Sequence, residues 1–268
     1  MNPKICYSIK NFDEFSFEKY NFKGYEFRAD AKGFKLNILK LLKIKRMFKG
    51  KDLSLHSQLS KIFSCNEKGY LEFNKVELNI LEAEIIISNI IGIKQINFHM
   101  KEGFLTKEEK KKFQKIINFA KKKGIEMIYE SNSFCKAKNT IKFLEDFSEV
   151  NYCLDFGHIN TAIHSEKFEM GLMKFIDKIK DRTVHIHAHN NYGKKDAHDS
   201  LGKGNFPWKK VLDKLKNQNL RKIIIENRTK EDLYLNIPII TKDGEITWKA
   251  KYPNQEAIEK QKARIEKP

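Results

Sequence analysis

Histidines are concentrated in one stretch of this chain. The sequence has eight histidines in 268 residues, and four of them fall within the segment HIHAHNNYGKKDAH. His185, His187 and His189 alternate with apolar residues, so in a strand all three imidazoles face one side. Asp196 and His198 follow two positions apart in the next loop. These residue types at this spacing indicate a metal site; the alternative is a polar strand that is rich in imidazole.

Further imidazoles and carboxylates stand at the ends of six consecutive predicted strands. The whole set is His56, His99, Glu130, Asp155, His158, His187, Asp196, His198 and Glu226. Each residue alone is typical of an ordinary strand end. Nine such groups at one mouth would be costly to desolvate, and divalent cations would relieve that cost. Imidazole and carboxylate without thiolate suit zinc, manganese or iron. We assign His185 a structural role, and we place His189 beside the ligands or against the substrate.

Short apolar strands alternate with amphipathic helices along most of the chain. The predicted strands cover residues 4–9, 24–29, 52–57, 95–100, 125–131, 151–157, 183–189 and 222–227. Parallel strands need crossover connections, and helices supply them. Eight such units at this length predict an α/β fold, a closed (β/α)8 TIM barrel over residues 1–230. An open doubly wound sheet is the alternative, but the chain has neither a G-x-G-x-x-G nor a G-x-x-x-x-G-K-[ST] loop.

The clearest helix is predicted over residues 106–124. Thr106 and Glu109 form a capping-box pattern at its start, and Gly124 is placed to end it. Apolar residues recur at the spacing of one buried helix face, and the lysines form a solvated outer face. Two more helices are predicted, over residues 78–92 and 206–218.

The last part of the chain, residues 231–268, departs from this alternation. Residues 237–250 predict a hairpin around Lys242, Asp243 and Gly244, and residues 254–267 predict a charged helix. We expect a short C-terminal appendage to the barrel.

Composition narrows the environment and the partners of the protein. The balance of 52 basic against 35 acidic residues favours polyanions such as DNA, or anionic substrates; a surface simply rich in lysine is the alternative. The four cysteines are far apart, which indicates reduced thiols in the cytoplasm. The most apolar stretch, residues 80–93, is too short to span a bilayer, and no signal peptide is expected. We expect no membrane association, and no protein partner is evident.

Three motifs resemble a known superfamily. LDFGH (154–158), HAHNNYGKKDAHDSLGKG (187–204) and IIIEN (223–227) are similar to those of xylose isomerase-like barrels. That superfamily includes endonuclease IV (AP endonuclease family 2), which cleaves DNA at abasic sites, and many sugar and sugar-phosphate isomerases and epimerases. The resemblance extends over residues 4–230.

Each branch of the superfamily implies a ligand set. The isomerase branch implies one Mn²⁺, Zn²⁺ or other divalent ion, held by Glu130, Asp155, His187 and Glu226. The endonuclease branch implies up to three Zn²⁺ ions, held by all nine residues of the set above. All nine have the expected chemistry, although the segments HSQL, HMKEG and YESNSF differ from the loops of endonuclease IV, and DFGH is closer to the sugar enzymes.

Two enzyme functions follow from the resemblance. The main hypothesis is an endonuclease IV-like phosphodiester hydrolase acting on abasic DNA in repair, with Glu130, Glu226 and His158 as catalytic residues and a multinuclear zinc site. The alternative is a sugar or sugar-phosphate isomerase or epimerase with a single ion, in which Glu130 and Glu226 exchange a proton and His158 holds a substrate oxygen. A barrel that binds metal and an anion without turnover is a third class.

Overall fold

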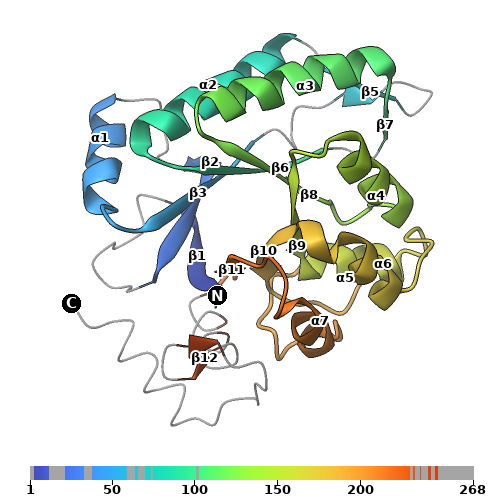
Figure 1. Ribbon diagram of the computed structural model, residues 1–268. Helices are drawn as coiled ribbons and strands as arrows, with labels where there is room; N and C mark the ends of the chain where they lie inside the picture. Colours follow the sequence, from blue (N-terminus) through green and yellow to red (C-terminus); the bar gives the residue numbers. More distant parts are fainter. Residues whose placement is uncertain are drawn as a thin grey trace.

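Eight parallel strands close into a barrel in the computed structural model of this chain (Figure 1). The structure describes residues 3–11, 22–32, 38–58, 64–65, 70–73, 75–100, 103–229, 232, 236, 241–242 and 245–246. The barrel strands are β1 (Lys4–Asn11), β2 (Gly24–Lys32), β3 (Asp52–His56), β6 (Gln95–His99), β8 (Glu126–Glu130), β9 (Asn151–Asp155), β10 (Thr183–Ala188) and β11 (Lys222–Ile225). Each pairs with the next barrel strand along the chain, and β11 returns to β1. The predicted (β/α)8 barrel is confirmed, and the open sheet is excluded.

Helices surround the strands on the outside of the barrel (Figure 1). They are α1 (Ile38–Met47), α2 (Lys75–Ile91), α3 (Lys107–Lys122), α4 (Ala137–Asp146), α5 (Phe156–His164), α6 (Leu172–Ile179) and α7 (Trp208–Leu215). Their apolar faces form the main core against the outer side of the strands. Phe113 of α3, for example, is fully buried and lies 5.4 Å, ring to ring, from Phe98 of β6. Burial of such aromatic rings is a large contribution to the stability of the barrel.

Helix α3 begins and ends as predicted. The Thr106 hydroxyl accepts a 3.2 Å hydrogen bond from the backbone N–H of Glu109, which satisfies one donor at the helix start. The apolar face is buried through Phe113, Ile116, Ile117 and Ala120. Gly124 has a φ of +67°, the left-handed conformation that commonly terminates a helix.

Several strand ends differ from the predictions by one to three residues, as in β2, which was predicted over 24–29 and extends to Lys32. Two differences have a clear cause. The sixth barrel strand was predicted over 151–157, but β9 ends at Asp155 and α5 begins at Phe156. The apolar run continues directly into the helix, so hydrophobicity alone does not mark the boundary. In addition, β4 (Ser64–Cys65), β5 (Tyr70–Glu72) and β7 (Phe104–Leu105) form a small separate sheet. Strands of two or three residues are too short to give a periodic pattern.

The C-terminal region is described only in part. β12 (Thr241–Lys242) pairs antiparallel with β13 (Glu245–Ile246), in agreement with the predicted hairpin. The predicted helix over 254–267 lies outside the described residues. The division between barrel and appendage near residue 230 stays a prediction.

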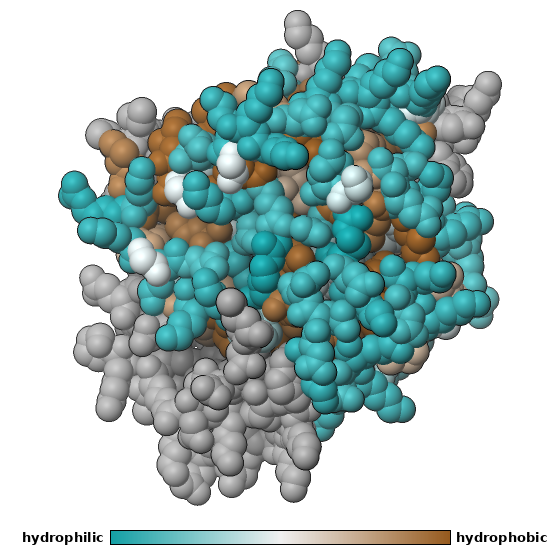
Figure 2. Space-filling model, viewed as in Figure 1, coloured by the Kyte–Doolittle hydropathy of each residue, from teal (hydrophilic) through white to brown (hydrophobic). Residues whose placement is uncertain are grey.

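Most of the visible face in Figure 2 is hydrophilic. Among the described helices, none is both long enough and apolar enough to cross a membrane. Large apolar side chains that are nevertheless exposed include Val76, Ile86 and Ile90 of α2.

The inside of the barrel is polar toward the carboxyl ends of its strands. Register places Arg28 beside His56, His99 beside Glu130, and His187 beside Asp155. Side chains alternate between the two faces of a strand, so residues two positions apart share the interior. The fold therefore places charged groups from different strands at similar heights.

Candidate metal centre

All nine residues singled out from the sequence meet at one end of the barrel. A cavity of ≈ 290 Å³ opens there, and seven of the nine contribute to its wall. The other two, Asp155 and His187, are buried, at 1% and 0% exposed. Their convergence follows from the fold, because parallel barrel strands all end at the same mouth.

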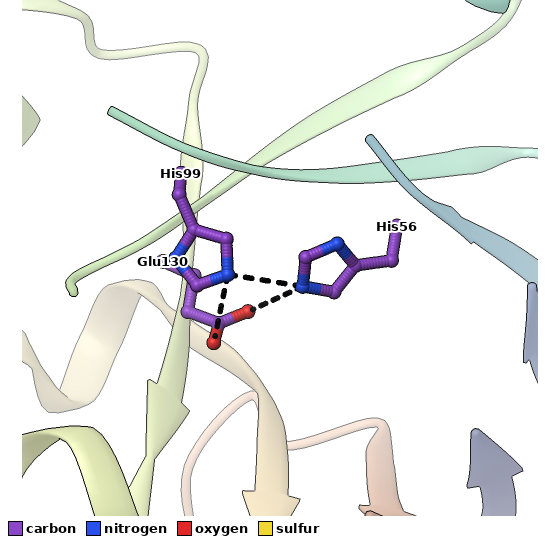
Figure 3. A group of neighbouring side chains, drawn as sticks. All are labelled: His56, His99 and Glu130. Carbon is purple, nitrogen blue, oxygen red and sulfur yellow. Dashed lines mark hydrogen bonds and ion pairs between the residues drawn. The ribbon is translucent and has the colours of Figure 1, made fainter. Parts of the chain in front are cut away.

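The first group joins His56 of β3, His99 of β6 and Glu130 of β8. The two imidazole Nε2 atoms lie 3.0 Å apart. Nε2 of His56 lies 3.6 Å from Glu130 Oε2, and Nε2 of His99 lies 3.4 Å from Glu130 Oε1. In Figure 3 the three side chains point toward one another from three separate strands. Two nitrogens and a carboxylate converging in this way can hold one divalent ion.

The second group is centred on His187 of β10. Its Nδ1 atom lies 3.1 Å from Glu226 Oε2, 3.2 Å from Glu130 Oε2 and 3.6 Å from Asp155 Oδ2. Three carboxylates around one ring nitrogen repel one another unless a cation lies among them. Glu130 belongs to this group and to the first one, so the two groups share a ligand.

The third group lies at the mouth, where Asp196 and His198 of the loop after β10 meet His158 of α5. His198 Nε2 lies 2.8 Å from Asp196 Oδ2, and His158 Nε2 lies 3.5 Å from the same oxygen. His189 contributes as well: its Nδ1 is 3.8 Å from Asp196 Oδ1, and its ring stacks on His198 with centroids 4.1 Å apart. His189, predicted to lie beside the ligands or the substrate, is fully buried, and its Nε2 is 2.9 Å from Asp155 Oδ2.

The D-x-x-H motif has a simple structural cause. Asp155 is the N-cap of α5, and its Oδ1 accepts a 2.7 Å hydrogen bond from the backbone N–H of His158. A residue three positions after an N-cap lies in the first helical turn, beside the cap. This spacing brings the imidazole of His158 to the cavity wall, with its Nδ1 3.7 Å from Asp155 Oδ2.

Backbone carbonyls hold several imidazoles with one nitrogen facing the cluster. The Nδ1 atom of His158 lies 2.9 Å from the Ser131 carbonyl oxygen, and that of His198 lies 2.9 Å from the Glu226 carbonyl oxygen. The Nδ1 atom of His56 lies 3.1 Å from the Ser57 carbonyl oxygen. A carbonyl only accepts, so Nδ1 carries the hydrogen and Nε2 presents a lone pair to the site. In this tautomer a histidine can bind a metal through Nε2.

Burial and charge set the ionisation of the imidazoles. Burial lowers the pKa of His56 to about 3, and Arg28 and His99 contribute to this lowering. Burial also lowers the pKa of His99. Both rings are therefore neutral at physiological pH, as metal coordination requires.

The carboxylates are ionised although they are buried. Burial opposes the charge of Glu130, but His187 and His99 hold its pKa well below the usual range. Burial likewise opposes the charge of Asp155, and His158 is the main group that lowers its pKa well below normal. Burial opposes a positive charge on His187 and His158, but neighbouring acidic groups raise the pKa of both rings well above normal. A divalent ion that displaces these protons would take over the positive charge among the carboxylates.

Atoms without hydrogen bonds provide an independent test of this fit. Among the described residues, Glu130 Oε1, His187 Nδ1, His189 Nδ1 and Asp196 Oδ1 are buried and have no hydrogen-bond partner. Buried polar atoms are normally paired. Unpaired ligand-type atoms that face one another fit a divalent ion.

Sequence reasoning missed three polar residues of this centre, of which Glu26 and Asn97 are buried and Arg28 is partly exposed. Glu26 and Arg28 lie on β2, a strand from which no functional group was predicted, and Asn97 lies on β6. Arg28 Nη1 donates a 2.9 Å hydrogen bond to Glu226 Oε1, and the Asn97 amide donates to Glu130. A signal was present in the segment YEFRA, where charged residues alternate with aromatic ones and so share one face of the strand.

Two residues show how closely the centre is packed. Gly157, at the start of α5, faces His189: a Cβ atom added at residue 157 would lie 2.1 Å from His189 Cε1. His185 is fully buried in the barrel, and its structural role stays a prediction. In contrast, His164 at the end of α5 bonds through Nδ1 to the Asn160 carbonyl, away from the cluster.

Comparison with protein-family models identifies the fold family. Residues 17–249 match the model described as xylose isomerase-like TIM barrel, AP_endonuc_2. The chain belongs to this family. The resemblance stated from the three motifs is thereby confirmed.

Two curated relatives of this xylose isomerase-like barrel come from Methanocaldococcus jannaschii. The uncharacterized protein MJ1311 is 31% identical over 118 residues, which is 44% of this chain and 37% of that protein. The uncharacterized protein MJ1614 is 33% identical over 97 residues, which is 36% of each chain. The matches thus span little more than a third of the relatives' length.

Solved structures agree with the fold at low sequence identity. A D-tagatose 3-epimerase-like protein superposes with a TM-score of 0.69 and 19% identity, covering 85% of this chain and 92% of its own. D-psicose 3-epimerase from Clostridium cellulolyticum, solved with D-tagatose, gives a TM-score of 0.61 and 13% identity over 98% and 96% of the two chains. The TTHB071 protein from Thermus thermophilus, soaked with ZnCl2, gives a TM-score of 0.62 and 16% identity. The match covers 85% of this chain and 93% of that protein.

Proposed function

We propose that this xylose isomerase-like barrel is a metal-dependent isomerase or epimerase of a sugar or sugar phosphate. The observation that carries the proposal is the arrangement around His187 Nδ1, where Glu130, Asp155 and Glu226 lie within 3.6 Å. Two of these carboxylates, Glu130 and Glu226, also reach the cavity wall. A cation site flanked by two carboxylates that line a cavity suits proton transfer at a carbon next to a carbonyl group.

The proposed chemistry divides between the ion and the two glutamates. A divalent ion held by Glu130, Asp155, His187 and Glu226 would polarise a carbonyl and acidify the hydrogen on the adjacent carbon. One glutamate then removes that proton and the other supplies a proton. Return of the proton to the opposite face of the same carbon gives an epimer, whereas return to the neighbouring carbon, with the carbonyl shifted, gives an isomer.

Other residues of the cavity position the substrate. His158 is 14% exposed at the wall, and its Nε2 side can hold a substrate oxygen. His56 and His99 are neutral and offer hydrogen bonds to further hydroxyl groups. A cavity of ≈ 290 Å³ lies near the lower end of the range of small-molecule sites, which suits a monosaccharide.

The comparisons favour this alternative over the hydrolase that the sequence placed first. The structural neighbours described above include two proteins named as 3-epimerases or 3-epimerase-like. At 19% identity and below they establish the fold, and their named activities enter only as support for the proposal.

Hydrogen exchange with solvent tests the proposal directly. The protein, loaded with Mn²⁺ or Zn²⁺, is incubated in D2O with a panel of ketoses and ketose phosphates. We expect deuterium at the carbon next to the carbonyl, and loss of the exchange in Glu130→Gln and Glu226→Gln. Glu109→Gln, a buried carboxylate on α3 outside the cavity, is the matched control and should exchange like the wild type. No exchange by the loaded wild type with any member of the panel would refute the proposal.

A second candidate, the phosphodiester hydrolase, is favoured by one observation. Asp196, His198 and His158 form a further group at the mouth, with Nε2 of His198 2.8 Å from Asp196 Oδ2. A single ion needs only the second group of ligands, so this additional group suits a site with more than one ion. The formal net charge of +17 suits binding to a nucleic acid. Cleavage of an abasic-site duplex that a chelator abolishes would support the hydrolase. Intact duplex under conditions where deuterium exchange proceeds would exclude it.

A further inference from the structure

A buried carboxylate lies behind the central imidazole of the proposed metal centre. Glu26 of β2 is 0% exposed, and its Oε1 lies 2.9 Å from His187 Nε2. Its other oxygen accepts a 3.2 Å hydrogen bond from the Ser54 hydroxyl on the adjacent strand β3. No described residue gives Glu26 Oε1 a well-aligned hydrogen bond. The imidazole of His187 is therefore the polar group that lies beside this unpaired oxygen.

The two nitrogens of His187 face different groups. Nε2 faces Glu26, whereas Nδ1 faces the carboxylates of Glu130, Glu226 and Asp155 at 3.1–3.6 Å. Glu26 therefore lies on the far side of the ring from the ion that Nδ1 would bind. Glu26 can therefore hold the imidazole in place, but it is not placed to bind the ion itself.

One neighbouring group could favour the opposite tautomer. The Asn97 amide nitrogen lies 3.3 Å from His187 Nε2 and would donate to this atom if it carried no hydrogen. The same amide already donates to Glu130. The Glu26 oxygen is closer to Nε2, at 2.9 Å, and this buried oxygen lacks a donor among the described residues, which a hydrogen on Nε2 would supply. The contacts thus favour a hydrogen on Nε2 and a lone pair on Nδ1.

We propose that Glu26 is a positioning residue that holds His187 with Nδ1 toward the metal. A carboxylate behind a metal-binding imidazole fixes the tautomer and the ring orientation, and it strengthens the donor nitrogen. The inference rests on the metal site of the proposed function, but it does not depend on which substrate is converted.

The test measures metal binding and does not require turnover. Zn²⁺ and Co²⁺ are titrated against a chromophoric chelator in wild type, Glu26→Gln and Glu109→Gln. Loss of a carboxylate partner typically weakens metal binding about 10–100-fold, so we expect that loss in Glu26→Gln and wild-type affinity in Glu109→Gln. The absorption bands of bound Co²⁺ should shift in Glu26→Gln alone. Circular dichroism verifies that each variant is folded.

Two further measurements keep the inference testable if Glu26→Gln does not fold. Ser54→Ala removes the donor to Glu26 without touching His187, and we expect a smaller loss of affinity. Nitrogen-15 NMR of the Zn²⁺-loaded wild type should show the hydrogen of His187 on Nε2. A hydrogen on Nδ1, or equal affinity in wild type and Glu26→Gln, would overturn the inference while leaving the proposed function intact. A wild type that binds none of these ions would overturn both.

Discussion

Arg28 Nη1 lies 2.9 Å from Glu226 Oε1 and joins β2 to the residue after β11 across the barrel mouth. The glutamate is 2% exposed, so this contact replaces hydration that the buried carboxylate has lost. Arg28 is therefore both a structural partner and a competitor of any ion that Glu226 binds.

Removal of this guanidinium should destabilise the metal-free protein more than the loaded one. Loss of a partner from a buried charged acceptor costs about 1–3 kcal/mol, and we expect that decrease in the free energy of unfolding of Arg28→Ala without metal. A bound ion would compensate Glu226 and reduce the effect. Urea denaturation in chelator and in saturating Zn²⁺ measures both values. The same decrease under both conditions would contradict this account.

Metal content distinguishes the groups of the centre. Under the proposed function, elemental analysis should give about one ion per chain, held by four ligands. Asp155→Asn should lose that ion, whereas His198→Ala should keep it because His198 belongs to the group at the mouth. A content near three ions that falls in His198→Ala would instead favour the multinuclear hydrolase.

Acid should weaken one contact far from the cavity. Glu126 of β8 accepts a 3.0 Å hydrogen bond from Gln95 Nε2 and pairs with Arg221. Burial opposes its charge, but Arg221 and Gln95 lower its pKa below the usual value. A carboxyl group with a lowered pKa in the folded state stabilises the fold above its unfolded pKa, and this stability is lost as the pH falls through the folded value.

Glu126→Gln should therefore flatten the dependence of stability on pH below about pH 5. Thermal denaturation between neutral and acidic pH measures the change. Glu145→Gln, an exposed carboxylate on α4, is the control and should follow the wild type. An unchanged acid profile in Glu126→Gln would show that this contact contributes nothing.

The start of α3 provides a test of local stability. Thr106→Ala removes the side chain that accepts from the Glu109 N–H, and loss of an N-cap costs about 1 kcal/mol. Thr106→Ser keeps the hydroxyl and should retain most of this stability. Chemical denaturation of both variants compares the two free energies of unfolding.

Much of the barrel and its centre could be predicted from the sequence. Short apolar runs separated by amphipathic segments mark eight strands, and closure then brings groups as distant as His56 and Glu226 together. The sequence predicts this convergence because all strands of the barrel run in the same direction, so residues at their carboxyl ends lie at the same mouth.

What was missed depends on tertiary packing. Glu26 and Arg28 lie inside the barrel because of the pairing of β2 with β1 and β3, and a charged residue on a strand is otherwise expected to face solvent. The end of β9 was missed because Asp155 caps a helix without any break in hydrophobicity. The first error concerns pairing between strands, whereas the second concerns a local helix cap.

The absence of a side chain at residue 157 has a consequence for protein engineering. A single methyl group at this position, as in Gly157→Ala, would act as a wedge between the first turn of α5 and the ring of His189. The wedge would push the imidazole away from Asp155 while every ligand and every formal charge stays in the chain. This substitution would therefore change the positions of the side chains in the centre without removing any of them. A replacement of a ligand always removes a side chain.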